Sequence, residues 1–245
     1  MHTQDVEKLP DLWQRVLSAI SGGSVLDIAT AGGGFVNVLI QNLQDYTEII
    51  GIDVSQNAIQ EAQGAFEQKN VHFVLMDAER MDFEDARFDT VTIALSLHHL
   101  ANVPQVLAEA VRVLKPGGHL IVGEMYRGEL PEPQLTGVHV HHWRAEIDTA
   151  LGLTHNPTLT RQQIVGLVQG LGLRDVTFYD YAGLDEDPRH EATIKGVGDY
   201  IDRAIRDAQD LPDYEVFKQQ GEALRQRLHD VGVQNSPVLI AVGEK

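Results

Sequence analysis

The sequence predicts a doubly wound α/β fold: a mostly parallel seven-stranded sheet with an antiparallel last strand and helices on both faces. In the first half of the 245-residue chain, short apolar runs alternate with segments of helical periodicity. The runs are apolar throughout rather than at alternate positions, as in strands that are covered on both faces. Five strands separated by helices imply right-handed crossovers between parallel neighbours.

The first half supplies these five strands. An opening helix carries Leu12, Val16 and Ile20 on one face. Ser55 is the expected N-cap of a later helix. Strands are predicted at 24–29, 48–53, 71–76, 88–95 and 119–125, and helices between them at 35–43, from 56 to about 66, and around 106–114.

The second half has a different character. Residues 126–158 are rich in Pro, Gly and His, and we expect them to be irregular. Thr160 and Gln163 form a capping box before a short helix, and Gly172 ends it. Strands follow at 173–181 and 236–245, with a polar helical insertion at 183–232 between them.

We therefore expect a single domain over residues 1–245 with its core at 22–124. The segments 126–158 and 183–232 are predicted to lie on the substrate side. For 183–232, a lid, a dimerisation element and a solvated helical pair all stay open, and so does a homodimer.

Composition excludes several classes. The chain has no cysteine, which excludes disulfides, thiolate metal sites and a cysteine nucleophile. A formal net charge of −17 disfavours nucleic-acid substrates and anionic membrane surfaces. No apolar run approaches the roughly 20 residues of a membrane span. The first ten residues lack the basic and apolar regions of a signal peptide, so we expect a cytoplasmic protein.

The strongest motif is the strand–turn–helix VLDIATAGGGF at 25–35. Small residues crowd this turn, so the backbone can approach a ligand closely and the next helix presents free N–H groups. Taken alone, such a turn also fits a tight connection without a ligand.

Two carboxylates follow at the next strand ends. Asp53 lies about twenty residues past the turn, where an acidic residue can bind both hydroxyls of an adenosine ribose. Asp77 follows the third strand, where a carboxylate can accept the exocyclic amine of adenine. A solvated aspartate and a helix N-cap are the respective alternatives. Because ligands bind at the carboxyl ends of strands in such sheets, the three features together predict a nucleoside site.

With these motifs, the chain resembles the class I S-adenosylmethionine-dependent methyltransferases, and within them the small-molecule branch of the ubiquinone and menaquinone C-methyltransferases. VLDIATAGGGF is similar to the family's first motif and GIDVS to its second; VLMDAERMDF, FDTVTIALSLHHLANV and RVLKPGGHLIV are similar to the later segments. The likeness covers roughly residues 22–124. The family usually has D-x-G-x-G-x-G in the first motif, and here alanine replaces two glycines, which fits if the backbone avoids positive φ there.

The resemblance implies S-adenosyl-L-methionine as cofactor and a small-molecule acceptor. It implies that Asp27 contacts the methionine amino region, that Asp53 holds the ribose, and that Asp77 holds the adenine amine. The other implied cofactor-site residues are Ala29, Ala31 and Gly33 along the methionine, Val54 and Ala78 beside the two carboxylates, and Leu95 and Ser96 flanking the sulfonium.

Histidines are the candidates for catalysis. His98 and His99 follow the fourth strand at the mouth of the site, and packing or helix capping is the alternative role. The cluster HVHHW at 139–143 suggests that Tyr126, His142 and Trp143 line the substrate pocket. A metal could be drawn on His139, His141, His142 and Glu146, but the spacing matches no known motif, so we predict no metal site.

We thus predict an enzyme that transfers a methyl group to a small molecule. An S-adenosylmethionine-binding regulatory protein without catalysis is one alternative, motivated by the two alanines, and an NAD-dependent oxidoreductase is another. The segment after the fourth strand reads SLHH and not N/D-P-P-Y/F/W, which argues against adenine-N6 and glutamine-amide acceptors.

Overall fold

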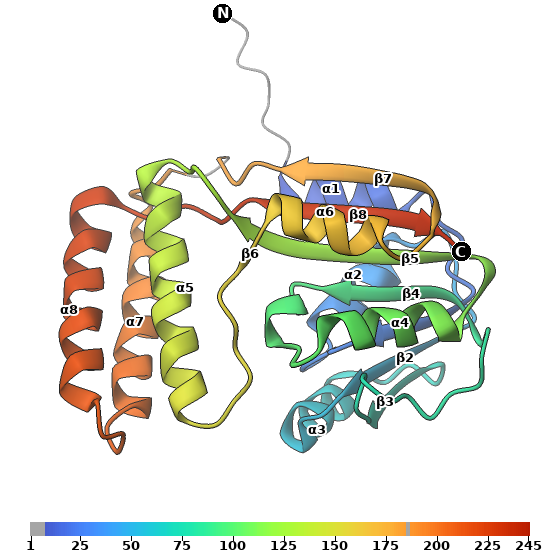
Figure 1. Ribbon diagram of the computed structural model, residues 1–245, viewed down its shortest axis with the longest axis horizontal. Coiled ribbons are helices and arrows are strands. Elements are labelled where there is room, and N and C mark those ends of the chain that lie inside the picture. The colour runs from blue at the N-terminus through green and yellow to red at the C-terminus, as the bar shows by residue number, and fades with distance from the viewer. Residues whose placement is uncertain (1–7, 185–186) are drawn as a thin grey trace, which may run out of the picture.

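The computed structural model describes residues 8–184 and 187–245. Residues 1–7 lie outside this part, and with them most of the first ten residues, for which we expect no signal peptide. Eight strands form one sheet in the order β3-β2-β1-β4-β5-β8-β7, and the short β6 pairs with β5 off this path (Figure 1). The strands are β1 (Ser24–Ile28), β2 (Glu48–Asp53), β3 (Val71–Leu75), β4 (Phe88–Ala94), β5 (Leu114–Arg127), β6 (Leu159–Thr160), β7 (Arg174–Tyr181) and β8 (Val238–Glu244).

The predicted fold class is confirmed. Strands β1 to β5 pair in parallel, and β8 runs antiparallel to both β5 and β7. The chain order reverses between β1 and β4, because β2 and β3 continue on one side of β1 and β4 and β5 on the other. In open α/β sheets this reversal point marks the place where ligands bind, at the carboxyl ends of the strands.

Helices cover both faces of the sheet, as predicted. The helices α1 (Leu9–Leu17), α2 (Gly34–Asn42) and α3 (Gln56–Ala65) share one buried apolar cluster with β1, β2 and β3. The helices α4 (Val103–Val113) and α6 (Arg161–Gln169) pack on the opposite face against β1, β4 and β5. The predicted capping box of Thr160 and Gln163 opens α6.

Strand β5 is longer than expected. It begins at Leu114 and includes the KPGG segment, which we predicted as a turn before the strand. Its pairing with β4 jumps from Phe88–Leu114 to Thr90–His119, so a bulge in β5 absorbs the turn.

The expectation that residues 126–158 are irregular is wrong. Helix α5 (Glu132–Ala150) occupies most of this segment. Pro133 lies in its first turn, where proline costs no intrahelical hydrogen bond. The helix buries side chains on several faces, polar ones included, so its sequence lacks the apolar stripe of a surface helix.

Helix α5 packs with α7 (Glu191–Asp207) and α8 (Tyr214–Val231) into a three-helix cluster beside the sheet (Figure 1). This cluster has its own apolar core, which includes Trp143, Ile147, Ile201 and Phe217. Within the described residues, no helix is long and apolar enough to span a membrane. Helices α7 and α8 confirm the helical content that we predicted for 183–232, and both pack with α5.

Candidate functional site

The first strand carries a buried carboxylate near its end. Asp27 is 1% exposed, and its Oδ1 accepts a 2.7 Å hydrogen bond from the Thr92 hydroxyl on β4. Its Oδ2 has no hydrogen-bond partner in the described part of the chain. Burial raises the pKa of Asp27 to about 6, because removal from water disfavours the charged carboxylate. An unsatisfied buried oxygen of this kind is suited to a ligand that donates hydrogen bonds.

The turn after β1 has a backbone that we did not expect. Ala29 and Ala31 have φ angles of 56° and 47°, so both occupy the left-handed region that the sequence argument required them to avoid. A non-glycine residue in this region destabilises the folded state by on the order of 1–2 kcal/mol. Gly33 has a φ angle of 84°, and a Cβ there would lie 2.6 Å from the Phe66 ring. Glycine is therefore required at position 33, and the alanines carry strain beside the candidate site.

Asp53 ties two strand ends together. Its Oδ2 accepts a hydrogen bond from the Ala31 N–H at 3.0 Å, and its Oδ1 accepts one from the Ser55 N–H at 2.8 Å. Ser55 caps α3 as predicted, since its hydroxyl oxygen accepts a hydrogen bond from the Ala58 N–H. An ionised carboxylate has about four acceptor positions, so Asp53 keeps room for two ligand hydroxyls.

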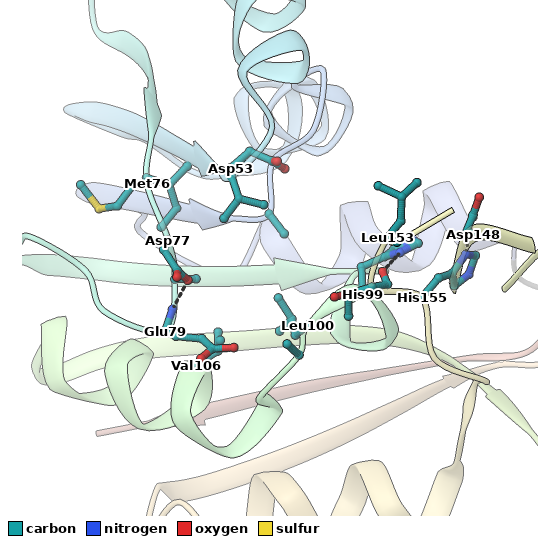
Figure 2. A pocket seen from close by; sticks show the side chains of 17 residues that line it. Asp53, Met76, Asp77, Glu79, His99, Leu100, Val106, Asp148, Leu153 and His155 are labelled. Carbon is teal, nitrogen blue, oxygen red and sulfur yellow. Dashed lines mark hydrogen bonds and ion pairs between the residues drawn. The ribbon is translucent and has the colours of Figure 1, made fainter. Parts of the chain in front are cut away.

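A first cavity of about 500 Å³ lies beyond the ends of β1, β2 and β3. Asp53 and Asp77 both line it, and Asp77 accepts a hydrogen bond at 2.9 Å from the Glu79 N–H (Figure 2). Figure 2 shows His99 and His155 at the other end of the same cavity. The first cavity thus brings together the four residues predicted for the nucleoside: Asp53, Val54, Asp77 and Ala78.

A second cavity of about 580 Å³ adjoins the β1 turn. Trp13 of α1 and Phe35 of α2 line it with rings 4.7 Å apart in an edge-to-face arrangement. Gly33 is absent from its lining, while the neighbouring Gly34 takes part. Five predicted cofactor-site residues also line it: Asp27, Ala29, Ala31, Leu95 and Ser96.

A third cavity of about 670 Å³ lies between the strand ends and the three-helix cluster. His99 lines the first, second and third cavities, and Leu95 lines the second and third. Leu95 has a φ angle of 52°, and its N–H donates a hydrogen bond to the Gly123 carbonyl at 2.7 Å. The 3-10 turn η1 (Leu97–His99) that follows β4 therefore stands where the three cavities meet.

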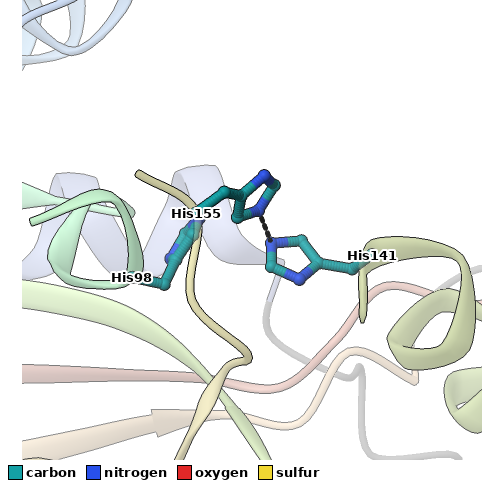
Figure 3. A group of neighbouring side chains, drawn as sticks. All are labelled: His98, His141 and His155. Carbon is teal, nitrogen blue, oxygen red and sulfur yellow. Dashed lines mark hydrogen bonds between the residues drawn. The ribbon is translucent and has the colours of Figure 1, made fainter. Parts of the chain in front are cut away.

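Three histidines from separate elements meet in the third cavity (Figure 3). His98 comes from η1, His141 from α5, and His155 from the loop between α5 and β6. One ring nitrogen of each lies within 4.8 Å of the other two. Burial lowers the pKa of His141 to about 3, because a charged ring would lose its hydration. His141 is therefore a neutral imidazole at physiological pH.

Carboxylates hold two of these rings. Glu124, fully buried on β5, lies 3.0 Å from Nδ1 of His98, and Asp148 lies 2.7 Å from Nδ1 of His155. The His155 loop is fixed to η1, since the Asn156 N–H donates a hydrogen bond to the His98 carbonyl at 2.7 Å. The cluster is therefore supported from β5, α5 and the loop together.

Sequence reasoning missed part of the third cavity. His155 stood before Asn-Pro and carried no more local signal than a turn cap. Arg144 and Arg203 line the cavity, and Arg144 pairs with Asp148 at 2.7 Å. Arg203 makes no ion pair within residues 8–184 and 187–245, and besides this cavity it lines a surface hollow with Asp199 and Asp202. These residues come from α5, α7 and a loop, and only the tertiary structure brings them together.

The predicted substrate residues lie elsewhere. The Tyr126 hydroxyl donates to Asp180 at 3.3 Å, and His142 lies 2.9 Å from the Thr158 hydroxyl. Trp143 is buried in the three-helix core, where its indole N–H donates to the Phe217 carbonyl at 3.1 Å. None of the three lines the first, second or third cavity. His142 and Trp143 instead line a separate surface hollow between α5 and α8, together with His139 and Glu146.

Residues 26–122 match the family described as "Methyltransferase domain". A ubiquinone/menaquinone biosynthesis C-methyltransferase UbiE from Desulfotalea psychrophila is 34% identical over 113 residues, which cover 44% of this chain and 46% of that protein. A demethylmenaquinone methyltransferase from Lactococcus lactis is 31% identical over 131 residues, covering 51% and 52%. The chain therefore spans about half the length of the curated relatives that it matches.

Solved structures show the same fold over nearly the whole chain. A SAM dependent methyltransferase from Archaeoglobus fulgidus aligns with a TM-score of 0.57 at 18% identity, covering 97% of this chain and 93% of that one. The [4+2]-cyclase SpnF aligns with a TM-score of 0.63 at 20% identity, covering 96% and 79%. Because a cyclase shares the fold, the fold by itself does not fix the reaction.

Proposed function

We propose that this chain methylates a small-molecule acceptor with S-adenosylmethionine, because residues 26–122 match a methyltransferase domain, UbiE-type C-methyltransferases are relatives, and a SAM dependent methyltransferase shares its fold. The proposed cofactor is S-adenosyl-L-methionine, which fits the family match and the shared fold. The observation that carries the proposal is the position of His99. It lines the two cavities that contain the predicted cofactor residues and also the third cavity, which is free for an acceptor.

The residues at the strand ends fit this cofactor. The free Oδ2 of Asp27 suits a donor such as the methionine ammonium. Asp53, held by two backbone N–H groups, suits the ribose hydroxyls, and Asp77 suits the adenine amine. The strained turn at Ala29 and Ala31 lets the backbone line the second cavity directly.

The sulfonium supplies an electrophilic methyl group, and the chain's part is to align the acceptor and exclude water. Leu95 and Ser96 line the second cavity, and Leu95 also lines the third, so its apolar side chain would contact a ligand at this junction. His99 would contact the acceptor at the same place and hold it in line with the methyl group. The substrate-side segments would then be α5 and α7, since Arg144, Asp148, Tyr200 and Arg203 line the third cavity.

Calorimetric titration with S-adenosylmethionine, S-adenosylhomocysteine and NAD in parallel tests the proposal. We expect micromolar binding of both adenosyl ligands and no heat from NAD. Silence from both adenosyl ligands would overturn it.

For turnover, we expect His99→Ala to lower kcat by about tenfold or more while the cofactor Kd changes little. An equal loss in both would make His99 a structural residue.

The net charge of −17 supports an acceptor other than nucleic acid, because a phosphate backbone is repelled. A homodimer and a cytoplasmic location stay predictions from the sequence. Gel filtration with light scattering tests the first, and fractionation of cells tests the second.

A further inference from the structure

We infer that His98, His141 and His155 bind one divalent transition-metal ion in the third cavity, and that this ion holds the acceptor through an ionised oxygen. The first half of the inference stands on the histidine geometry alone. The second half rests on the proposed methyl transfer.

The spacing of the three rings suits a metal. Nε2 of His155 lies 3.2 Å from Nε2 of His141, and one nitrogen of each ring lies within 4.8 Å of the others. A tetrahedral zinc ion with Zn–N bonds of about 2.0–2.1 Å separates its ligand nitrogens by about 3.4 Å. One pair is therefore already close to this separation, and the third nitrogen lies within 4.8 Å of both.

The carboxylates around the cluster orient the rings as in known metal sites. Glu124 and Asp148 each accept from the Nδ1 of one ring, His98 and His155 respectively. A ring whose Nδ1–H donates to a carboxylate presents the lone pair of Nε2 on its other side. Metal-ligating histidines almost always have such a partner, which fixes the tautomer and raises the basicity of the ligand.

The third ring is held less tightly. Nδ1 of His141 is buried and has no hydrogen-bond partner among the described residues. Two lone pairs cannot bond each other, so without an ion a proton lies between the two Nε2 atoms. When His155 has its single proton on Nδ1, facing Asp148, this proton belongs to Nε2 of His141. An ion at the centre replaces that proton, which moves to Nδ1 of His141, so all three rings bind as neutral ligands.

Three neutral imidazoles leave coordination positions open and the full double charge of the ion in place. The third cavity provides the space for an acceptor, and Arg203 adds a cation that is unpaired within the described residues. These features favour an anionic oxygen donor, such as a phenolate, catecholate or enolate. Such an oxygen loses its proton to solvent on binding the ion, as a zinc-bound water does near neutral pH. The acceptor thus becomes electron-rich next to His99, where the second and third cavities meet.

Metal binding is tested on full-length protein that has been stripped with a chelator and dialysed. We expect one equivalent of Zn²⁺ per chain in competition with a chromophoric chelator, and visible d–d bands of a low-coordinate site with Co²⁺. His141→Ala and His155→Ala should each weaken Zn²⁺ binding by about a hundredfold, and Asp148→Asn by about tenfold. His139→Ala is the matched control: it lies exposed on the same helix and outside the third cavity, and should bind Zn²⁺ as the wild type does.

Circular dichroism and S-adenosylmethionine titration on each variant separate loss of metal from loss of fold. A wild type that binds S-adenosylmethionine but no more Zn²⁺ than His141→Ala overturns the metal site and leaves the proposed function intact. A wild type that binds Zn²⁺ but neither adenosyl ligand supports the metal site and overturns the proposed function.

The acceptor half is tested with catechol as the probe. Added to the Co²⁺-loaded protein, catechol should shift the d–d bands, whereas 1,2-dimethoxybenzene, which has the same ring and no ionisable hydroxyl, should not. A shift with both compounds or with neither overturns binding through an ionised oxygen. His155→Ala, loaded with the same Co²⁺ concentration, should show no catechol-dependent shift.

Discussion

The strand-end edge of the sheet and the three-helix cluster hold their polar groups in different ways. At the edge, Asp53 and Asp77 each accept a hydrogen bond from a backbone N–H two residues further along the chain. In the cluster and around it, the partners are distant in sequence: the Trp143 indole donates to a carbonyl 74 residues away. The local hydrogen bonds of Asp53 and Asp77 leave carboxylate oxygens that face a cavity, whereas the Trp143 hydrogen bond joins α5 to α8.

This difference separates two kinds of function. The edge holds residues that are suited to one shared ligand, and each of them belongs to a motif in a short stretch of sequence. The cluster closes the third cavity and supplies Arg144, His141 and Arg203 to it from two helices. Mutations should therefore affect ligand binding at the edge and folding in the cluster core, and the predictions below test that division.

The largest effect is expected in the cluster. Trp143→Ala removes a buried aromatic ring and its hydrogen bond, which should lower the free energy of unfolding by about 3–5 kcal/mol. The cofactor Kd, measured well below the melting temperature, should not change. Chemical denaturation gives the first quantity and calorimetry the second, with the exposed His139→Ala as the neutral control. An unchanged stability with a raised acceptor KM would instead favour the substrate contact that the sequence suggested.

The reason why the sequence did not predict α5 lies in the helix itself. The helix buries residues toward α7, α8 and the loop that carries Thr158, so polar and apolar side chains alternate without a stripe, and proline and glycine obscure the pattern further. By contrast, the strands and helices of 22–124 bury mainly apolar side chains, and their predicted positions are close to those observed. Apolar periodicity reveals a helix that buries one face against one partner, and α5 has several partners.

The next effect concerns Asp27. Its pKa is 3.8 in a solvated reference and about 6 in the folded chain, so between these values the folded protein binds more protons than the unfolded one. Stability therefore falls as pH rises through this window. Each pKa unit is worth about 1.4 kcal/mol, so the charged form costs up to about 3 kcal/mol at neutral pH.

Asp27→Asn removes this charge and should raise the free energy of unfolding at neutral pH by about 1–3 kcal/mol. It should also flatten the dependence of stability on pH between about 4 and 6, while S-adenosylmethionine binding weakens. Denaturation curves at several pH values measure the first two expectations. A variant that is less stable at neutral pH would show that the Asp27 carboxylate has a stabilising partner in the folded state.

A smaller effect is expected from Asp53→Ala, which should weaken cofactor binding by more than tenfold, or about 1.4 kcal/mol, while the protein stays folded. Asp82→Ala removes the same charge from an exposed position on the same half of the chain and should leave the Kd unchanged. Calorimetric titration of both variants decides. Equal losses would mean that overall charge, and not the position of Asp53, sets the affinity.

Part of the site could be predicted because it depends on strand ends. Asp27, Asp53 and Asp77 each lie at or just past a buried apolar run, and parallel strands bring such positions to one edge. The histidine cluster could not be predicted, because His98, His141 and His155 are 43 and 14 residues apart and belong to a 3-10 turn, a helix and a loop. The backbone of the β1 turn was also missed, since alanine gives no sign of a positive φ.

That turn provides the smallest predicted effect. Ala31 has a φ angle of 47°, where glycine carries no Cβ penalty, and the relief of about 1–2 kcal/mol is partly offset by the greater freedom of glycine in the unfolded chain. Ala31→Gly should therefore raise the free energy of unfolding by about 0.5 kcal/mol. Ala223→Gly, in the interior of α8, should lower it by about 1 kcal/mol, because a helix there gains nothing from glycine. Denaturation of the two variants side by side gives the sign of each change in the free energy of unfolding. A decrease in both would mean that the β1 turn holds Ala31 without strain. Opposite signs would show that a strained backbone at the edge brings the turn to the second cavity.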